Sequence, residues 1–364
     1  MDPKTLTVGL MADPGLPGAV ATAVAAGLSR DLSDGDSTGT RWDVDVSHDQ
    51  LPLNSDGEVP LVEHARQLRE DHGWDYVIYL TELPRSHDQQ PLLGEFSPSA
   101  RAALVSLPTL GMRRLRSRTR KLLREVVRSA LRDAQGCPSE SEVRDALGRG
   151  KVRRVPPAGT GDISYVLLPG RVNEWRLLCG MVRSNRPGRM VPALSSSIAA
   201  AMATGAFGIF YASIWSMADA LPLWRLAFVS AVVITALSTW LILHNGLWDR
   251  PRQNPEPWRA HLDNAATVIT VWLSVALMYA ILFAGLFVVG LTVIETGYLQ
   301  SQLGHPVNLT DYVHLSWLAA SLGTLAGALG SNFDSDDAIR EATYSRREHQ
   351  RRQRADSYSD SGDG

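Results

Sequence analysis

Short apolar runs alternate with segments of helical spacing over roughly the first half of the chain. Runs typical of buried strands predict strands over 5–11, 42–46, 74–81, 91–96, 101–107 and 163–168. Apolar residues three and four positions apart predict helices over 19–32, 61–72, 113–132 and 172–182. Because strands and helices alternate, we expect an α/β domain with a mixed sheet over residues 1–170.

Four long uncharged stretches follow, and each is bounded by charged residues. They cover 191–217, 226–248, 264–294 and 312–333. A helix of about 20 apolar residues crosses the hydrocarbon core of a bilayer with its backbone groups hydrogen-bonded. We therefore expect an all-α domain of four transmembrane helices over 191–333. The third stretch, roughly 46 Å long as a helix, is expected to be one helix that tilts or projects into the headgroups.

Basic residues gather before the first stretch, between the second and third, and after the fourth. These groups are Arg176, Arg183, Arg186 and Arg189; Arg250, Arg252 and Arg259; and Arg340, Arg346, Arg347, Arg351, Arg352 and Arg354. The loop 295–311 has no Lys or Arg. By the positive-inside rule, both termini are cytoplasmic and the chain crosses the cell membrane several times. Residues 171–190 then form a basic connector, and 334–364 form a cytoplasmic helix with a disordered tail.

Composition adds few constraints to this picture. The chain has 364 residues and a net charge of −2. Its two cysteines, Cys137 and Cys179, imply neither a disulfide framework nor a cysteine-based zinc site, and they suit a reducing cytoplasm. The first residues lack the basic segment and long apolar core of a signal peptide, so we expect none.

The predicted helix 113–132 is strongly amphipathic. One face collects Leu115, Leu122, Leu123, Val126, Val127 and Ala130. The opposite face carries Arg114, Lys121, Arg124, Arg128 and Arg132. The pattern fits a core-packed helix with a solvated basic surface, and it also fits a helix that contacts anionic lipid headgroups. The candidate lipid contacts are Arg114, Lys121, Arg128 and Arg132. Nucleic acid is disfavoured because no aromatic interleaving or recognition motif accompanies the charge.

Part of this domain resembles the archaemetzincin-type zinc peptidases. In that family a strand ending in Thr-Asp precedes a strand entering Gly-Glu, then a strand ending in Ser-x-x-x-Leu, and then the zinc-binding helix. This chain has DYVIYLTEL at 75–83, LGE at 93–95 and ALVSL at 103–107. REVVR at 124–128 stands where the family has His-Glu-x-x-His. The resemblance implies a zincin-like fold for the domain.

The two positions that bind zinc in that family are Arg124 and Arg128 in this chain. A guanidinium stays protonated and offers no lone pair to zinc. Glu125 alone cannot hold a metal. The resemblance therefore implies a pseudo-zincin that lacks its metal and puts peptidase activity in doubt. We expect no catalytic residue, no cofactor and no metal site in this chain.

Other motifs of this domain are weak. Gly9, Gly15 and Gly18 follow a strand and precede a helix, as a phosphate-binding turn would. Their spacing matches neither the dinucleotide-binding motif nor the Walker motif, so a plain turn is the favoured interpretation and nucleotide binding the minor one. The histidines are scattered, and we expect surface positions more than a metal site for His48, His64, His72 and His87.

From residue 180 onward the chain resembles a group of uncharacterised four-span membrane proteins of actinobacterial type. The matching segments are GMVRSNRP at 180–187, NAATV at 264–268, GHPV at 304–307 and ALGS at 328–331. The resemblance implies the four-span topology and implies no activity.

The four stretches contain no Asp, Glu, Lys or Arg away from their ends, whereas transporters usually carry such groups at depth. We therefore favour a non-enzymatic binding or scaffolding role at the inner leaflet. The alternative is a membrane-tethered hydrolase with an unrecognised site, and a small-solute transporter comes third. The expected partner is the lipid bilayer with its anionic headgroups. A homo-oligomer or an unknown membrane partner stays open.

Overall fold

The computed structural model describes residues 5–34, 40–54, 58–132, 136–157, 162–248 and 257–330. These residues form two compact units, one of 5–184 with 257–262 and one of 185–248 with 263–330. The first unit reaches Ser184, so most of the segment expected as a connector belongs to it as helix α5 (Arg171–Asn185). The helix and tail expected over 334–364 lie outside the described residues.

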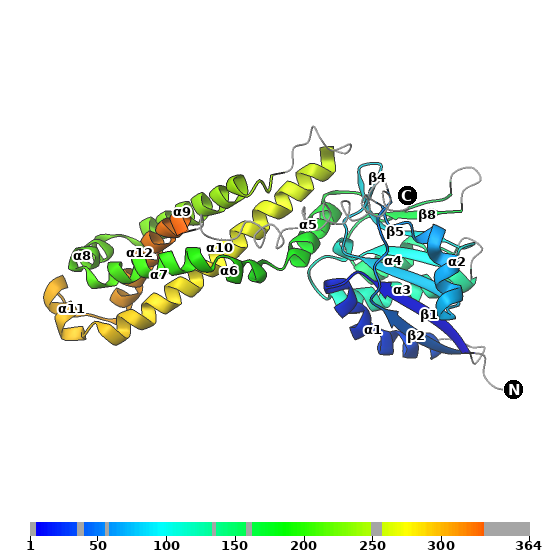
Figure 1. The fold of residues 1–364 in the computed structure, drawn as a ribbon, viewed down its shortest axis with the longest axis horizontal. Coiled ribbons are helices and arrows are strands. Elements are labelled where there is room, and N and C mark those ends of the chain that lie inside the picture. The colour runs from blue at the N-terminus through cyan, green and yellow to red at the C-terminus, as the bar shows by residue number, and fades with distance from the viewer. Residues whose placement is uncertain are drawn as a thin grey trace, which may run out of the picture. The chain divides into compact units, whose positions relative to one another are not determined.

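The first unit is built on a mixed sheet, as its strand pattern predicts (Figure 1). Its parallel part contains β1 (Thr5–Ala12), β2 (Arg41–Ser47), β3 (Tyr76–Thr81) and β6 (Ala102–Ser106). Its antiparallel part adds β5 (Gln90–Ser97), β8 (Ser164–Leu167) and β7 (Arg153–Val155). The strand order is β2-β1-β3-β6-β5-β8-β7, and the two-residue strand β4 (Ser86–His87) pairs with β5. The α/β class is confirmed.

Helices cover both faces of this sheet. The main core joins β1 and β3 residues such as Leu10 and Ile78 to α1 (Leu16–Ser33), α3 (Leu115–Arg132) and α4 (Glu140–Leu147). Helix α2 (Leu61–His72) buries Leu61 and Ala65 outside that cluster and contacts β3 and β6. A right-handed crossover from β2 to β3 puts α2 on the opposite face from α1, because the two crossovers run in opposite directions. Strands β4 and β7 and helix α4 are absent from the sequence-based prediction.

The second unit is all helical. Its elements are η2 (Pro187–Arg189), α6 (Met190–Ala193), α7 (Ser195–Phe210), α8 (Ala212–Ala220), α9 (Leu223–His244), α10 (Pro257–Val293), α11 (Thr296–Leu303) and α12 (Leu309–Gly330). Helices α7 and α12 pack very closely: a Cβ at Gly323 would lie 2.4 Å from the carbonyl oxygen of Ala201. Small residues at this contact are what close packing of membrane helices needs.

Among the described residues, two helices are long and apolar enough to cross a membrane, Leu223–His244 and Trp258–Val293. The third expected stretch is one unbroken helix, as predicted. The first expected stretch is not one helix, because α7 and α8 meet at an 88° bend, where Tyr211 has an extended backbone. If this bent pair counts as one span, the number rises to three. The expected single helix over 191–217 was wrong because the apolar pattern runs through the break, where the indole of Trp215 donates to the carbonyl oxygen of Ile209.

Candidate functional site

Three of the four candidate lipid contacts lie on helix α3: Lys121, Arg128 and Arg132. The fourth, Arg114, immediately precedes the helix. Its apolar face faces the core as predicted: Leu115, Leu122, Leu123, Val126 and Val127 are buried, and Ala130 packs partly against them. Neighbouring helices α1 and α4 flank it on the sheet (Figure 1). The opposite, basic face divides into two parts that differ in their partners.

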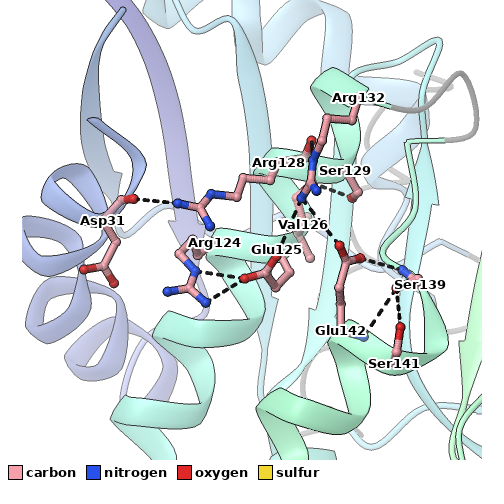
Figure 2. Close-up of polar contacts among 10 residues, drawn as sticks. All are labelled: Asp31, Arg124, Glu125, Val126, Arg128, Ser129, Arg132, Ser139, Ser141 and Glu142. Carbon is pink, nitrogen blue, oxygen red and sulfur yellow. Dashed lines mark hydrogen bonds and ion pairs between the residues drawn. The ribbon is translucent and has the colours of Figure 1, made fainter. Parts of the chain in front are cut away.

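The second half of α3 is an ion-pair network (Figure 2). Arg124 binds Glu125 through Nη2 and Oε1 at 2.7 Å, and the Glu125 side chain is only 13% exposed. Arg132 bridges Glu125 at 3.7 Å and Glu142 of α4 at 3.4 Å. Arg128 donates to the carbonyl oxygen of Asp31 in α1 at 3.1 Å. The candidate contacts Arg128 and Arg132 therefore have partners within the domain.

A cavity of about 270 Å³ lies beside this network, lined by Lys121, Arg124, Glu125, Glu142, Asp145 and Ala146. Two basic side chains face three acidic ones in its wall, so the wall carries no positive excess. An anion gains nothing from Coulomb attraction in such a cavity. The second half of α3 is therefore a structural region in this domain.

The start of α3 is different. Arg113, Arg114, Arg116 and Lys121 are exposed, and none forms an ion pair with a carboxylate in the described part of the chain. The first turn of the helix holds no acidic residue. Positive side chains at a helix N-terminus are unfavourable because the helix dipole is positive there. We call these four residues the basic cluster. They concentrate positive charge, and only Lys121, at the edge of the cluster, also lines the cavity with Glu125, Glu142 and Asp145.

Two half-buried arginines, Arg118 and Arg176, lie next to the basic cluster. Arg118 donates to the carbonyl oxygen of Leu110 at 2.8 Å. Burial, and then the charge of Arg114, lower the pKa of Arg118. Burial, and then the charge of Arg118, lower the pKa of Arg176 in α5. Burial is the larger cause of both lowered pKa values, and repulsion between neighbouring positive charges adds to it. A bound anion would relieve that repulsion.

Helix α5 holds the start of α3 in place. Arg183 donates from Nη1 to the carbonyl oxygen of Met112. Gly180 lies so close to the segment before α3 that a Cβ would come within 1.9 Å of the Pro108 carbonyl oxygen. The last residue of α5, Asn185, is the first of the second unit. The basic cluster is therefore fixed to the helix that leads directly into the apolar unit.

Large apolar side chains are exposed on the same elements. Met112 is 43% exposed just before α3, and in α5 Val172 and Trp175 are 58% and 63% exposed. Val172, Trp175 and the exposed Cys179 recur at helical spacing and share one face of α5. Tryptophan beside basic residues is typical of the bilayer interface.

The positions that match the zinc motif hold no metal-binding geometry. Arg124 is bound to Glu125, and Arg128 reaches towards α1 (Figure 2). Within the described residues of the first unit, no three His, Cys, Asp or Glu side chains bring ligand atoms together. Its histidines have separate neighbours: His64 faces the Pro60 carbonyl, His72 stacks on Trp74, and His87 stacks on Tyr165.

The glycine turn after β1 is occupied by a carboxylate. Asp13 is buried and accepts hydrogen bonds from the Tyr79 hydroxyl at 2.5 Å, the Thr81 hydroxyl at 2.8 Å and the Glu82 amide at 3.0 Å. This negative charge beside the N-terminus of α1 repels a phosphate group. The turn therefore ties the ends of β1 and β3 together, which favours the plain-turn interpretation.

Sequence analysis missed a buried ionic group formed by Glu95 of β5 and Arg85, which precedes β4. Arg85 is 8% exposed and binds Glu95 at 2.8 Å and Glu58 at 3.4 Å. Burial raises the pKa of Glu95 despite the opposing effect of Arg85. Nη1 of Arg85 is buried without a hydrogen-bond partner among the described residues. The sequence did contain a signal for this group, because Glu95 is the one acidic residue in the apolar run PLLGEF at 91–96.

No family model, curated protein or solved structure matches this chain.

Proposed function

We propose that this chain is a multi-pass membrane protein whose α/β domain docks on the anionic inner leaflet through the basic cluster of α3. In this proposal both termini are cytoplasmic, and the membrane holds α9, α10, α12 and the bent pair of α7 and α8. The role is non-enzymatic binding or scaffolding at the membrane surface. The α/β domain is a pseudo-zincin, since the order β3, β5, β6 and α3 follows the resemblance while arginines occupy the ligand positions.

Membrane insertion is supported by the apolar helices of the second unit. Leu223–His244 and Trp258–Val293 have the length and composition of spans. The Lys and Arg distribution supports the orientation. A cysteine replacing Gln302 should react with an impermeant reagent added outside the cell, and one replacing Gln253 should not. The reverse pattern would refute the orientation.

The observation that carries the docking proposal is the unpaired basic cluster on a domain joined to apolar helices by α5. A basic residue near an anionic leaflet contributes about 1 kcal/mol, and this attraction decays within a Debye length of about 10 Å. Four unpaired residues therefore supply roughly 4 kcal/mol if all reach the surface. Arg124 and Arg132 at the other end of α3 contribute less, because Glu125 and Glu142 compensate their charge. Arg128 keeps its charge, because its partner is a neutral backbone carbonyl.

Hydrogen exchange of the full chain in nanodiscs tests this proposal. Amides of residues 112–121 should exchange more slowly in nanodiscs with anionic lipid than in neutral ones, and added salt should remove the difference. The lipid dependence of exchange should disappear in a variant that combines Arg113→Gln, Arg114→Gln, Arg116→Gln and Lys121→Gln. The control variant removes the same charge elsewhere on the domain and should keep the lipid dependence of exchange. It combines Arg41→Gln, Arg66→Gln, Arg144→Gln and Arg153→Gln. Equal exchange in both lipids would refute docking by the basic cluster.

A membrane-tethered hydrolase is the second candidate, and Glu95 is the observation that favours it. A buried acid with a raised pKa beside an arginine is a frequent arrangement in catalytic sites. A substrate-dependent activity of the purified chain that Glu95→Gln abolishes would support this candidate over scaffolding. Solute flux in liposomes would instead support the transporter.

A further inference from the structure

Asp219 lies beside His305 and Asp311 in the second unit although it is far from both in the sequence. Asp219 is near the end of α8, His305 follows α11, and Asp311 is in the first turn of α12. One ligand atom of each side chain lies within 4.8 Å of those of the other two. Nε2 of His305 is 3.2 Å from an Oδ1 of Asp219. Two zinc ligands at a tetrahedral ion are about 3.3 Å apart, given metal–ligand bonds of about 2.0 Å.

The imidazole of His305 is held in an orientation suited to a metal ligand. Its Nδ1 lies 3.0 Å from the carbonyl oxygen of Pro306 and can donate a proton to it. With the proton on Nδ1, Nε2 offers a lone pair 3.2 Å from Oδ1 of Asp219. Metal-bound histidines usually donate their second ring nitrogen to a carbonyl or carboxylate in this way, which fixes the tautomer.

Asp311 also keeps an oxygen for a metal. Its Oδ2 accepts from the Asn308 amide at 2.7 Å, which caps α12. The cap uses one carboxylate oxygen and holds the side chain at the helix start. His305 and Asp311 are thus held by local hydrogen bonds, and Asp219 meets them from α8.

The surroundings of this group are negative. The loop 295–311 contains no Lys or Arg, and Glu295 adds a further carboxylate that caps α11. The nearest basic residue along the chain is Arg225, and its guanidinium lies over the ring of Trp224, 5.6 Å from the centroid. With a neutral imidazole, Asp219 and Asp311 leave a charge that a divalent cation can neutralise.

We propose that Asp219, His305 and Asp311 form a binding site for a divalent metal ion of the zinc class. One imidazole nitrogen and two carboxylate oxygens match the ligands that zinc takes from proteins, and exposure of the group leaves further positions to water. Softer ions that require thiolates do not fit, since the group contains no cysteine. Bound metal would join the end of α8 to the start of α12 and hold the bent segment after Tyr211 in place.

The test is a zinc titration of the purified, untagged full chain, with a chromophoric chelator as competitor and zinc chloride as the only added metal. A Cys179→Ser background removes the exposed thiol as an alternative ligand. The chain should bind one zinc ion at this site. Asp219→Asn, His305→Gln and Asp311→Asn should each weaken binding by about tenfold or more, as loss of a ligand or its support does. Asp311→Asn retains an oxygen for the helix cap.

Two exposed residues outside the group provide controls, and His261→Gln and Asp71→Asn should leave the affinity unchanged. Zinc should also slow hydrogen exchange of 212–220 and 304–311 in the starting protein and not in His305→Gln. This second readout separates a lost metal site from a misfolded variant. Absence of zinc binding, or binding equally strong in the three site variants, would overturn the proposal and leave an ordinary ion pair between His305 and Asp219.

Discussion

The start and the end of α3 carry the same type of side chain in different surroundings. Arg113, Arg114 and Arg116 form no ion pair with a described carboxylate, whereas Arg124 and Arg132 share the mostly buried Glu125. The acids that neutralise the end come from α3 itself and from α4, and they form no ion pair with the three arginines of the basic cluster. The comparison shows that a basic helix face is not one surface: its acidic neighbours decide which part is available to an external anion.

The largest expected effect comes from detaching the start of α3 from α5. Gly180→Val places a branched side chain where even a Cβ would meet the Pro108 carbonyl oxygen. Overpacking of this kind costs about 3 kcal/mol, and the basic cluster should lose its fixed position. Thermal unfolding in detergent should show a clearly lower Tm. Gly290→Ala, where the nearest neighbouring atom would be 3.7 Å from the Cβ, is the control and should change the Tm little. Equal Tm values for the two variants would contradict the close contact.

A second, smaller effect is expected at the end of α3. Glu125→Gln removes the partner of both Arg124 and Arg132 from a mostly buried position. We expect a loss of about 1–3 kcal/mol in stability, because charged groups lose their hydrogen bonds. The released arginines should then increase the salt-sensitive attraction of the domain to anionic nanodiscs. If Glu125→Gln neither destabilises the domain nor strengthens lipid attraction, the end of α3 is not neutralised as described.

The smallest effect on stability is expected from an ion pair located between the two halves of α3. Asp31 forms an ion pair with Arg120 at 3.1 Å, and these side chains are 29% and 46% exposed. Partly exposed pairs contribute up to about 1 kcal/mol, so Asp31→Asn should shift the Tm only slightly. The bond from Arg128 uses the backbone carbonyl of Asp31 and should persist. A large Tm change would mean that the acid supports more of α3 than this pair.

Sequence periodicity was sufficient to predict most strands and helices of the first unit, including the buried face of α3. It could not divide the basic face, because the neutralising Glu142 lies in α4, which was not predicted. Its Ser139–Glu142 capping box was a readable signal for that helix. The bend at Tyr211 was also hidden, since apolar residues continue through it.

The ligand group of Asp219, His305 and Asp311 shows a further limit of the sequence. The three residues stand in different loops and helix ends, and no spacing motif connects them. The packing of α8 beside α11 and α12 brings Asp219 to the other two, and Trp215 and Tyr298 are in edge-to-face contact 5.6 Å apart. Tertiary contacts of this kind leave no local pattern.

The most direct measurement compares the two ends of α3 at the membrane in one protein. A fluorophore is attached at Ser117→Cys, near the start of α3, or at Ser141→Cys, beside Glu142, each in a Cys179→Ser background. Both positions are exposed, so labelling should not disturb the core. In anionic nanodiscs containing lipids with quenching groups, the Ser117 probe should be quenched much more strongly than the Ser141 probe. High salt should reduce the difference. Equal quenching at both positions, or stronger quenching at Ser141, would contradict docking through the basic cluster.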